Sequence, residues 1–183
     1  MLTDGSLSVI YNEVDGAERV IMIFSGLIQC HPIGGVIIDW FGYDLKFLVD
    51  LGCRDVWICN TAANTGSLEC LEYAHTHGCP WDKGTCKYAA RGGYLKCLKY
   101  AHEHGCPWDH WTCIYAGSLK CLEYAHAHGC PWDELTTSHA AREGSLECLI
   151  YAHEHGCPWD KWTCFWVSSR ICLEYLKANG CPQ

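Results

Sequence analysis

A pentapeptide that recurs at regular intervals constrains the fold of this chain more than any other feature. Gly-Cys-Pro-Trp-Asp begins at residues 78, 105, 129 and 156, and a shortened Gly-Cys-Pro begins at residue 180. The steps between them are 27, 24, 27 and 24 residues. Periods of this length are typical of repeat proteins, in which each unit is one small motif that stacks on its neighbours.

The alternation of long and short steps indicates a duplicated pair of units. Residues 67–117 match residues 118–167 as blocks of about 51 residues. The short steps lack three residues, since CKYAARGGYLKC in one unit becomes CIYAGSLKC in the next.

Each unit is predicted to contain two short helices. Ser67 is a suitable N-cap for a helix that ends at Gly78, because its hydroxyl can accept a hydrogen bond from a first-turn amide and glycine favours the C-terminal position. Asp82 can cap a second helix over residues 83–91. Such a pair cannot bury its own apolar face. We therefore expect an all-α helical repeat solenoid, stabilised by stacking of its units.

The repeat resembles the ankyrin pattern T-P-L-H-x-A-A-x-x-G-x-L-x-V-V. The matching positions are Thr85, Ala89, Ala90, Gly92, Leu95 and Leu98. The chain departs from ankyrin repeats in its period, which is about 33 residues in that family, and in the CPWD segment, which replaces most of the β-hairpin finger. Repeats of this CPWD variety resemble those found in large arrays in giant DNA viruses and some protists. The resemblance implies a protein-protein interaction scaffold without catalysis.

The domain prediction is a non-repeat segment over residues 1–41, followed by an ankyrin-like array of about five units over residues 42–183. Residues 43–52 are predicted to form a capping helix, followed by a helix over 56–63, and the final helix is predicted over 171–179. Within the first segment, VIMIFSGLIQ and GVIIDWF are compatible with strands or with irregular packing segments.

Composition and charge exclude several functional classes. The net charge is −8, and the 13 Lys and Arg residues are scattered, so we expect no nucleic-acid partner. The N-terminus has no basic region, and the apolar stretch over residues 20–29 is too short to cross a bilayer. We expect an intracellular, cytoplasmic monomer (in the host cell if the chain is viral) with its 16 cysteines reduced. The sequence shows no phosphate loop, nucleophile elbow or H-E-x-x-H motif, and catalysis is not expected.

The periodic cysteines allow two interpretations. Three thiolates and one imidazole recur with zinc-like composition in three units: Cys70, His75, Cys79 and Cys86; Cys97, His102, Cys106 and Cys113; and Cys148, His153, Cys157 and Cys164. A zinc-stabilised structural array is therefore the alternative function. We favour small buried core cysteines and no cofactor, because Thr137 replaces the fourth ligand in an otherwise intact unit. Disulfides between equivalent cysteines are not expected, since neighbouring helices pack about 8–10 Å apart.

The histidines and tryptophans of each unit are predicted to be structural. In each His-x-His pair, such as His75 and His77, the first side chain is expected to pack and the second to lie exposed at the helix end. The tryptophans that follow proline, Trp81, Trp108, Trp132 and Trp159, are expected to form a ladder over the seams between units.

The positions directly after CPWD vary between units and are the predicted partner surface. Trp111 and Trp162 stand where other units have Gly84 and Leu135. Exposed aromatic side chains are frequent anchors in protein interfaces. The predicted partner-binding residues are Trp111, Trp162, His110, Leu135 and Lys161; partial burial of these side chains is the alternative.

Overall fold

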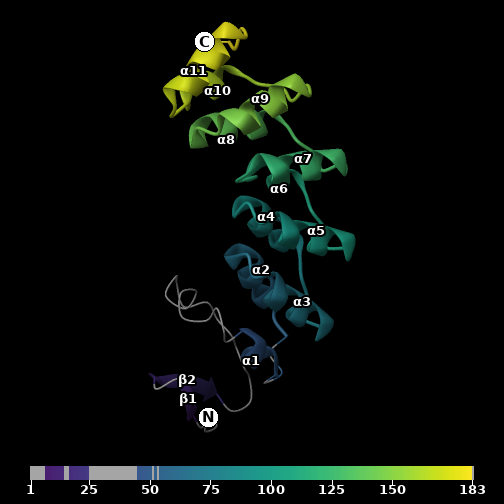
Figure 1. Cartoon of the computed structure of the whole chain (residues 1–183), viewed down its shortest axis with the longest axis vertical. Helices are drawn as coiled ribbons and strands as arrows, with labels where there is room; N and C mark the ends of the chain where they lie inside the picture. Colours follow the sequence, from purple (N-terminus) through teal and green to yellow (C-terminus); the bar gives the residue numbers. More distant parts are fainter. Residues whose placement is uncertain (1–6, 15–16, 25–44, 51, 53, 183) are drawn as a thin grey trace, which may run out of the picture. The chain divides into compact units, whose positions relative to one another are not determined.

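The computed structural model describes residues 7–14, 17–24, 45–50, 52 and 54–182 (Figure 1). Contacts divide the chain into two compact units, Met1–Trp40 and Phe41–Gln183. The first unit contains an antiparallel hairpin of β1 (Leu7–Val14) and β2 (Ala17–Phe24), whose register runs from Leu7 opposite Phe24 to Val14 opposite Ala17. The start of VIMIFSGLIQ is therefore a strand, whereas GVIIDWF lies outside the described residues.

The described part of the second unit consists of helices and their connections, as the repeat pattern predicts. The helices are α1 (Leu45–Asp50), α2 (Val56–Thr65), α3 (Leu68–Thr76), α4 (Lys83–Arg91), α5 (Leu95–Glu103), α6 (His110–Ile114), α7 (Leu119–Ala127), α8 (Glu134–Glu143), α9 (Leu146–Glu154), α10 (Lys161–Phe165) and α11 (Arg170–Ala178). The capping helix, its successor and the final helix all lie where the sequence predicts them.

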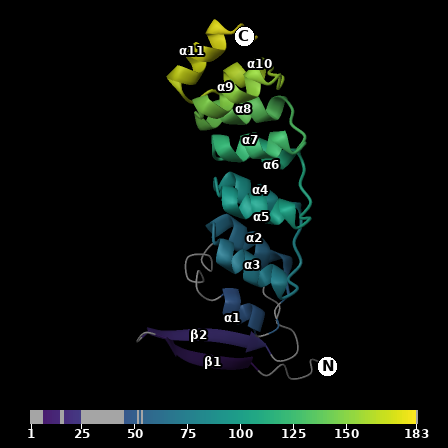
Figure 2. The same cartoon turned by 45° about the vertical axis from the view of Figure 1, so that its right-hand side comes forward.

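The helices form two rows that follow chain order. Helices α2, α4, α6, α8 and α10 make the first row, and α1, α3, α5, α7, α9 and α11 make the second row. Figures 1 and 2 show the helix pairs as successive layers of the second unit. Each first-row helix packs on its neighbours in the row, and α2, α4, α6 and α8 each pack on the second-row helix that follows in the chain.

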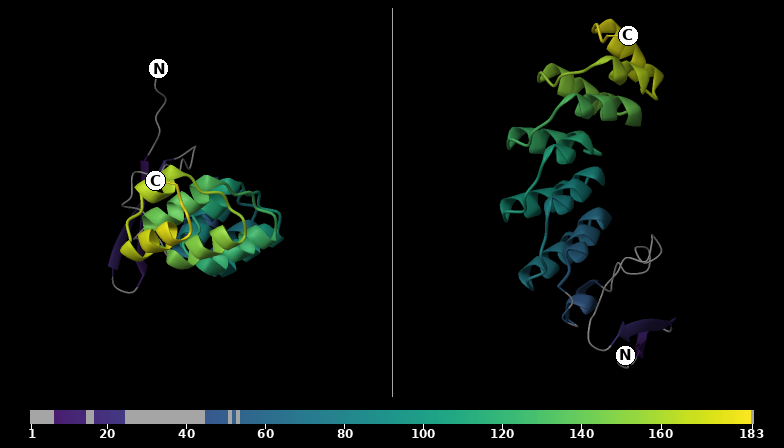
Figure 3. Two further views of the ribbon diagram at one scale, coloured as in Figure 1. Left: turned by 90° about the horizontal axis from the view of Figure 1, so that it is seen from above. Right: turned by 180° about the vertical axis from the view of Figure 1, so that it is seen from behind.

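The structure pairs the helices differently from the sequence prediction. The sequence analysis placed α3 and α4 in one unit as a packed pair. The structure packs α4 against α5, and the Gly-Cys-Pro-Trp-Asp segment connects one pair to the next. Extended connections run along one edge of the layers (Figure 3, right). Because proline cannot continue a helix, this segment leaves the second row as a linker instead of forming a tight helical hairpin.

The helix ends follow the sequence signals. The Ser67 hydroxyl accepts a hydrogen bond from the amide of Cys70, and an Asp82 carboxylate oxygen accepts one from the amide of Gly84 at 2.8 Å. The equivalent aspartate of each later CPWD segment caps the next first-row helix: Asp109 caps α6, Asp133 caps α8 and Asp160 caps α10. Such a cap stabilises a helix by about 1 kcal/mol. Because the capping aspartate directly follows each Cys-Pro-Trp, every first-row helix after α2 begins at the same distance from that segment.

The core is one column of leucines with small residues between the rows. Leu71, Leu98, Leu122 and Leu149 lie almost fully buried at the fourth position of α3, α5, α7 and α9, and Leu176 is buried in the last turn of α11. Alanines and cysteines fill the remaining contacts. Full burial of a leucine side chain contributes about 1.5–3 kcal/mol, so stacking supplies the stability that one pair lacks.

The short unit omits the last turn of its first helix. Helix α6 has 5 residues, whereas α4 has 9 and α8 has 10. The chain then returns at once, and the Gly117 amide donates a hydrogen bond of 2.9 Å to the carbonyl oxygen of Ala90 on α4. A Cβ atom at Gly117 would lie 2.1 Å from the Arg91 carbonyl oxygen, so only glycine fits this approach.

Candidate functional site: an aromatic face on the first row of helices

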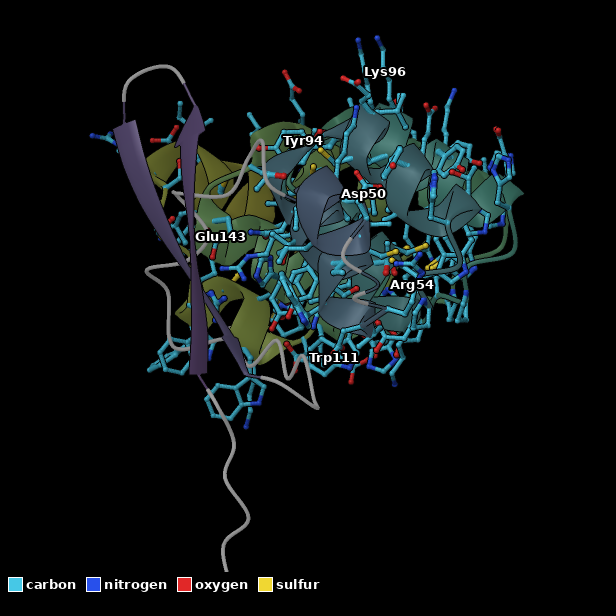
Figure 4. The ribbon with its side chains drawn as sticks, turned by 90° about the horizontal axis from the view of Figure 1, so that it is seen from below. Asp50, Arg54, Tyr94, Lys96, Trp111 and Glu143 are labelled. Carbon is cyan, nitrogen blue, oxygen red and sulfur yellow. The ribbon has the colours of Figure 1, made fainter. Side chains whose placement is uncertain are left out.

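The predicted partner residues all occupy the first two positions of α6, α8 and α10. Trp111, Leu135 and Trp162 share the second position and are 37%, 46% and 48% exposed. Lys161 is exposed and His110 is half-buried. In Figure 4, Trp111 and Tyr94 lie on opposite sides of the layers. The structure therefore places three large apolar side chains at equivalent exposed positions of consecutive units.

The exposed face continues for one more helical turn, which the sequence analysis missed. Tyr115 lies four residues after Trp111, and their rings stack at a centroid distance of 5.5 Å. Trp166 lies four residues after Trp162 and is 55% exposed, beside Phe165 at 68%. Side chains four residues apart are neighbours on a helix. Extending the comparison of variable positions by one turn would have found them. Trp111, Leu135 and Trp162, with Tyr115, Phe165 and Trp166, are called the aromatic face below.

A cavity of about 400 Å³ lies where α6 lacks its last turn. It is called the missing-turn cavity, and its lining residues are Arg91, Tyr115, Ala116, Gly117, His139, Ala140, Arg142, Glu143 and Ser145. The ring of Tyr115 meets that of His139 edge-on at 4.8 Å, which joins this cavity to the aromatic face.

Charges from two helices act on His139 inside this cavity. Burial lowers the pKa of its imidazole, and the positive charges of Arg142 and Arg91 lower that pKa further, against the opposing effect of Glu143. A Glu143 carboxylate oxygen lies 3.8 Å from Nε2 of His139 and 3.4 Å from Nε of Arg142. The cavity is therefore a polar site with an excess of basic groups.

A second cavity of about 370 Å³ lies at the last helix pair. Lys161, Trp162, Cys164, Phe165, Leu173 and Lys177 line it. It extends the aromatic face onto α11 and includes two of the predicted partner residues, Trp162 and Lys161.

The cysteines form contacts between units. The Cys106 thiol donates to the carbonyl oxygen of Asp82 at 3.2 Å, and the Cys86 thiol lies 3.9 Å from the carbonyl oxygen of Cys106. Burial raises the pKa of the Cys59 thiol to about 12, and the hydrogen bond to Cys106 together with burial raises the pKa of Cys86. The thiols of Cys59 and Cys86 therefore stay protonated at neutral pH. The sequence did not predict these thiol contacts between neighbouring units.

The four members of each candidate zinc set are not brought together. No group of three or more His, Cys, Asp or Glu side chains among the described residues has an arrangement that could hold a metal ion. In the first set, the His75 imidazole contacts Trp81 and Tyr100, and the Cys86 thiol contacts the next unit. Zinc coordination by these sets stays a prediction.

The stacked pairs match a solved repeat domain. The crystal structure of the human ASB11 ankyrin repeat domain aligns with 68% of this chain and 69% of its own length, with a TM-score of 0.55 and 16% sequence identity. The repeat array has the ankyrin repeat fold. Neither a protein-family profile nor a curated protein sequence matches the chain. The described residues contain no helix that is long and apolar enough to span a membrane.

Within the ankyrin units, the histidines and tryptophans have the structural roles expected for them. His75 stacks on Trp81 at 3.7 Å, and the exposed His77 ring places Nδ1 2.8 Å from the Tyr73 carbonyl oxygen at the end of α3. Trp81 also meets Tyr100 of the next pair edge-on at 6.2 Å. The tryptophans thus cover the seams through histidine and tyrosine rings, one set per seam.

Proposed function

We propose that the chain is a protein-protein interaction scaffold without catalysis, and that its partner binds across the aromatic face. The observation that carries the proposal is the exposure of Trp111, Leu135 and Trp162 at the same helical position in three consecutive units. Helices that pack side by side are about 8–10 Å apart. The three side chains therefore form a row with regular spacing, which suits an elongated segment of a partner.

The energetics favour this face over the rest of the surface. An exposed tryptophan costs hydration free energy that burial in an interface recovers, and tryptophan is frequent among the residues that dominate binding. The second row presents mainly charged side chains to solvent, such as Lys96 and Glu123. Charged residues are depleted at interface centres.

We also propose a reducing intracellular location and a monomeric state. The buried thiols of Cys86, Cys106, Cys113 and Cys130 are each engaged as hydrogen-bond donors to backbone carbonyl groups, an arrangement that a reducing compartment preserves.

The experiment uses a displayed library of random peptides selected against the full chain, with affinities measured by fluorescence polarisation. Replacing Trp111 by Ser should weaken binding of the selected peptides at least about tenfold, as expected for a central aromatic anchor. Lys96→Ser is the matched control on the second row and should leave the affinity unchanged. Binding that is insensitive to W111S and to a corresponding W162S would contradict the proposal.

A further inference from the structure

The missing-turn cavity follows directly from the alternation of unit lengths. The two long helices that flank it, α4 and α8, each carry an arginine after an Ala-Ala pair, at Arg91 and Arg142. The short helix α6 between them has no equivalent residue. Tyr115, Ala116 and Gly117, which follow α6, line the cavity on this side. The amide of Gly117 donates a hydrogen bond to the carbonyl oxygen of Ala90 and so keeps this segment against α4. The deletion therefore opens a gap between two equivalent arginines.

Basic groups prevail in this gap, although the chain as a whole has a net charge of −8. Its lining contains the guanidinium groups of Arg91 and Arg142, the imidazole of His139 and the single carboxylate of Glu143. The Arg91 guanidinium lies 6.0 Å from the Tyr115 ring centroid. None of the ion pairs among the described residues includes Arg91. Glu143 contacts Arg142 and His139 only at 3.4 Å and 3.8 Å.

The groups in the gap suit an oxyanion. A guanidinium can donate two parallel hydrogen bonds to a carboxylate or phosphate, and an imidazole that gains a proton adds a third charged donor. Tyr115 also lines the cavity, and its phenol hydroxyl is a group that can donate a hydrogen bond. A cation would face two guanidinium groups and one carboxylate.

We propose that the missing-turn cavity binds an oxyanion, a carboxylate or phosphate group, that is carried by a side chain of the partner bound on the aromatic face. This inference rests on the proposed function. The cavity volume of about 400 Å³ is in the range of small-molecule sites and leaves room for a side chain as well as its anionic group. Tyr115 contacts both Trp111 and His139, so a peptide that crosses Trp111 passes the mouth of the cavity.

The first test follows the His139 ring protons by NMR in the full chain, with inorganic phosphate and N-acetylglutamate as separate probes. An anion beside the ring favours the imidazolium, so each probe should raise the pKa of His139 towards its ordinary value. The groups that face this ring are Arg142 and Glu143 on α8, Arg91 on α4 and Tyr115 directly after α6. If the pKa of His139 stays unchanged at high concentrations of both probes, the proposal is overturned.

The second test distinguishes an anion on a partner from a free anion. Synthetic peptide libraries carry glutamate, phosphoserine or glutamine at one fixed position, with the other positions randomised, and are selected on the full chain. Glutamate or phosphoserine peptides should be enriched over glutamine peptides, and R91Q and R142Q should each weaken their binding about tenfold, as for the loss of one charge-assisted hydrogen bond. Lys96→Gln removes the same charge elsewhere and should have no effect.

Glu143→Gln is the variant that separates a binding role from damage to the fold. Removing the competing carboxylate should tighten binding of the acidic peptides several-fold, a gain that a destabilised protein would not show. If inorganic phosphate binds but glutamate and phosphoserine peptides are not enriched, the partner-borne anion is wrong. If neutral peptides bind equally well and W111S still weakens them, the cavity proposal fails while the proposed function stands.

Discussion

His75 and Tyr100 join two consecutive helix pairs through a hydrogen bond, with Nδ1 of the imidazole 3.1 Å from the phenol oxygen. The same contact recurs at every later seam, between His102 and Tyr124, His126 and Tyr151, and His153 and Tyr175, at 2.9–3.1 Å. The CPWD tryptophan of each linker stacks on the histidine. The seams of this short-period array are therefore closed by a repeated Trp-His-Tyr set.

Replacing Tyr100 by Phe removes one of these hydrogen bonds while the ring stays in place. We expect the free energy of unfolding to fall by about 0.5–1.5 kcal/mol, the usual net contribution of one hydrogen bond. Urea unfolding followed by circular dichroism measures the change. Tyr94→Phe is the control, because the Tyr94 ring packs near Gly66 and Gly92 and its phenylalanine replacement preserves that contact. Equal effects of the two variants would contradict the seam role.

Stability should decrease as the solution is acidified. Burial lowers the pKa of His75, His102 and His126 below the usual value of about 6.5. The charge of the second histidine of the next His-x-His pair lowers each of these pKa values further. The folded state therefore favours the neutral rings. The contribution of these neutral histidines to the free energy of unfolding is fully present above the pKa that they have in the unfolded chain. It is lost as the pH falls through their lower pKa in the folded protein. Urea unfolding at constant ionic strength should give a smaller free energy at pH 5 than at pH 7.5.

The control for this pH dependence is a triple variant with glutamine at residues 75, 102 and 126. Its unfolding free energy should depend less steeply on pH over the same range, because the three rings no longer titrate. A wild-type stability that is constant or higher at pH 5 would show that the seam histidines are not held neutral by the fold.

Gly117→Ala should destabilise the array where the short unit meets α4. The added Cβ would lie 2.1 Å from the Arg91 carbonyl oxygen, and this backbone atom cannot move without disturbing the end of α4. We expect a loss of about 1–3 kcal/mol, typical of overpacking. Gly84→Ala is the control, because the equivalent position of later units holds Trp111, Leu135 or Trp162 beside the same aspartate cap. The nearest atom to its added Cβ, at 2.7 Å, belongs to the side chain of Asp82 and not to the backbone. A thermal unfolding midpoint for G117A equal to that of the wild type would contradict the described turn.

Metal removal tests the alternative account of the cysteines. Prolonged dialysis against a strong chelator should leave the helical circular dichroism and the unfolding midpoint unchanged, because the described residues gather no set of three or more suitable side chains. A zinc-stabilised array would lose structure under the same treatment. Loss of helicity that zinc restores would establish that alternative.

Much of the repeat fold could be predicted because its signals are local. Ser67 and Asp82 mark helix starts by capping chemistry, and the glycine-proline combination marks the ends. The choice of packed pairs was wrong because sequence proximity favoured α3 with α4, whereas packing depends on which faces meet after the linker crosses between rows. Spacing alone does not carry that information.

The candidate site was predictable only in part. Trp111 and Trp162 stood out because their slot varies between units, and the same logic extends to Tyr115 and Trp166 one turn later. The missing-turn cavity was not predictable from the three-residue deletion alone. The cavity exists because the loop at Gly117 packs against α4 and its side chains do not occupy the space of the missing turn. This arrangement is a property of tertiary packing.

Hydrogen-deuterium exchange of the full chain, with and without a peptide selected from the displayed library, tests the central claim most directly. The account predicts added protection in the first turns of α6, α8 and α10 and around the loop at Gly117, with no change in the exposed second-row helices α5, α7 and α9. Protection confined to the second row, or to residues 7–24, would show that the aromatic face is not the partner surface.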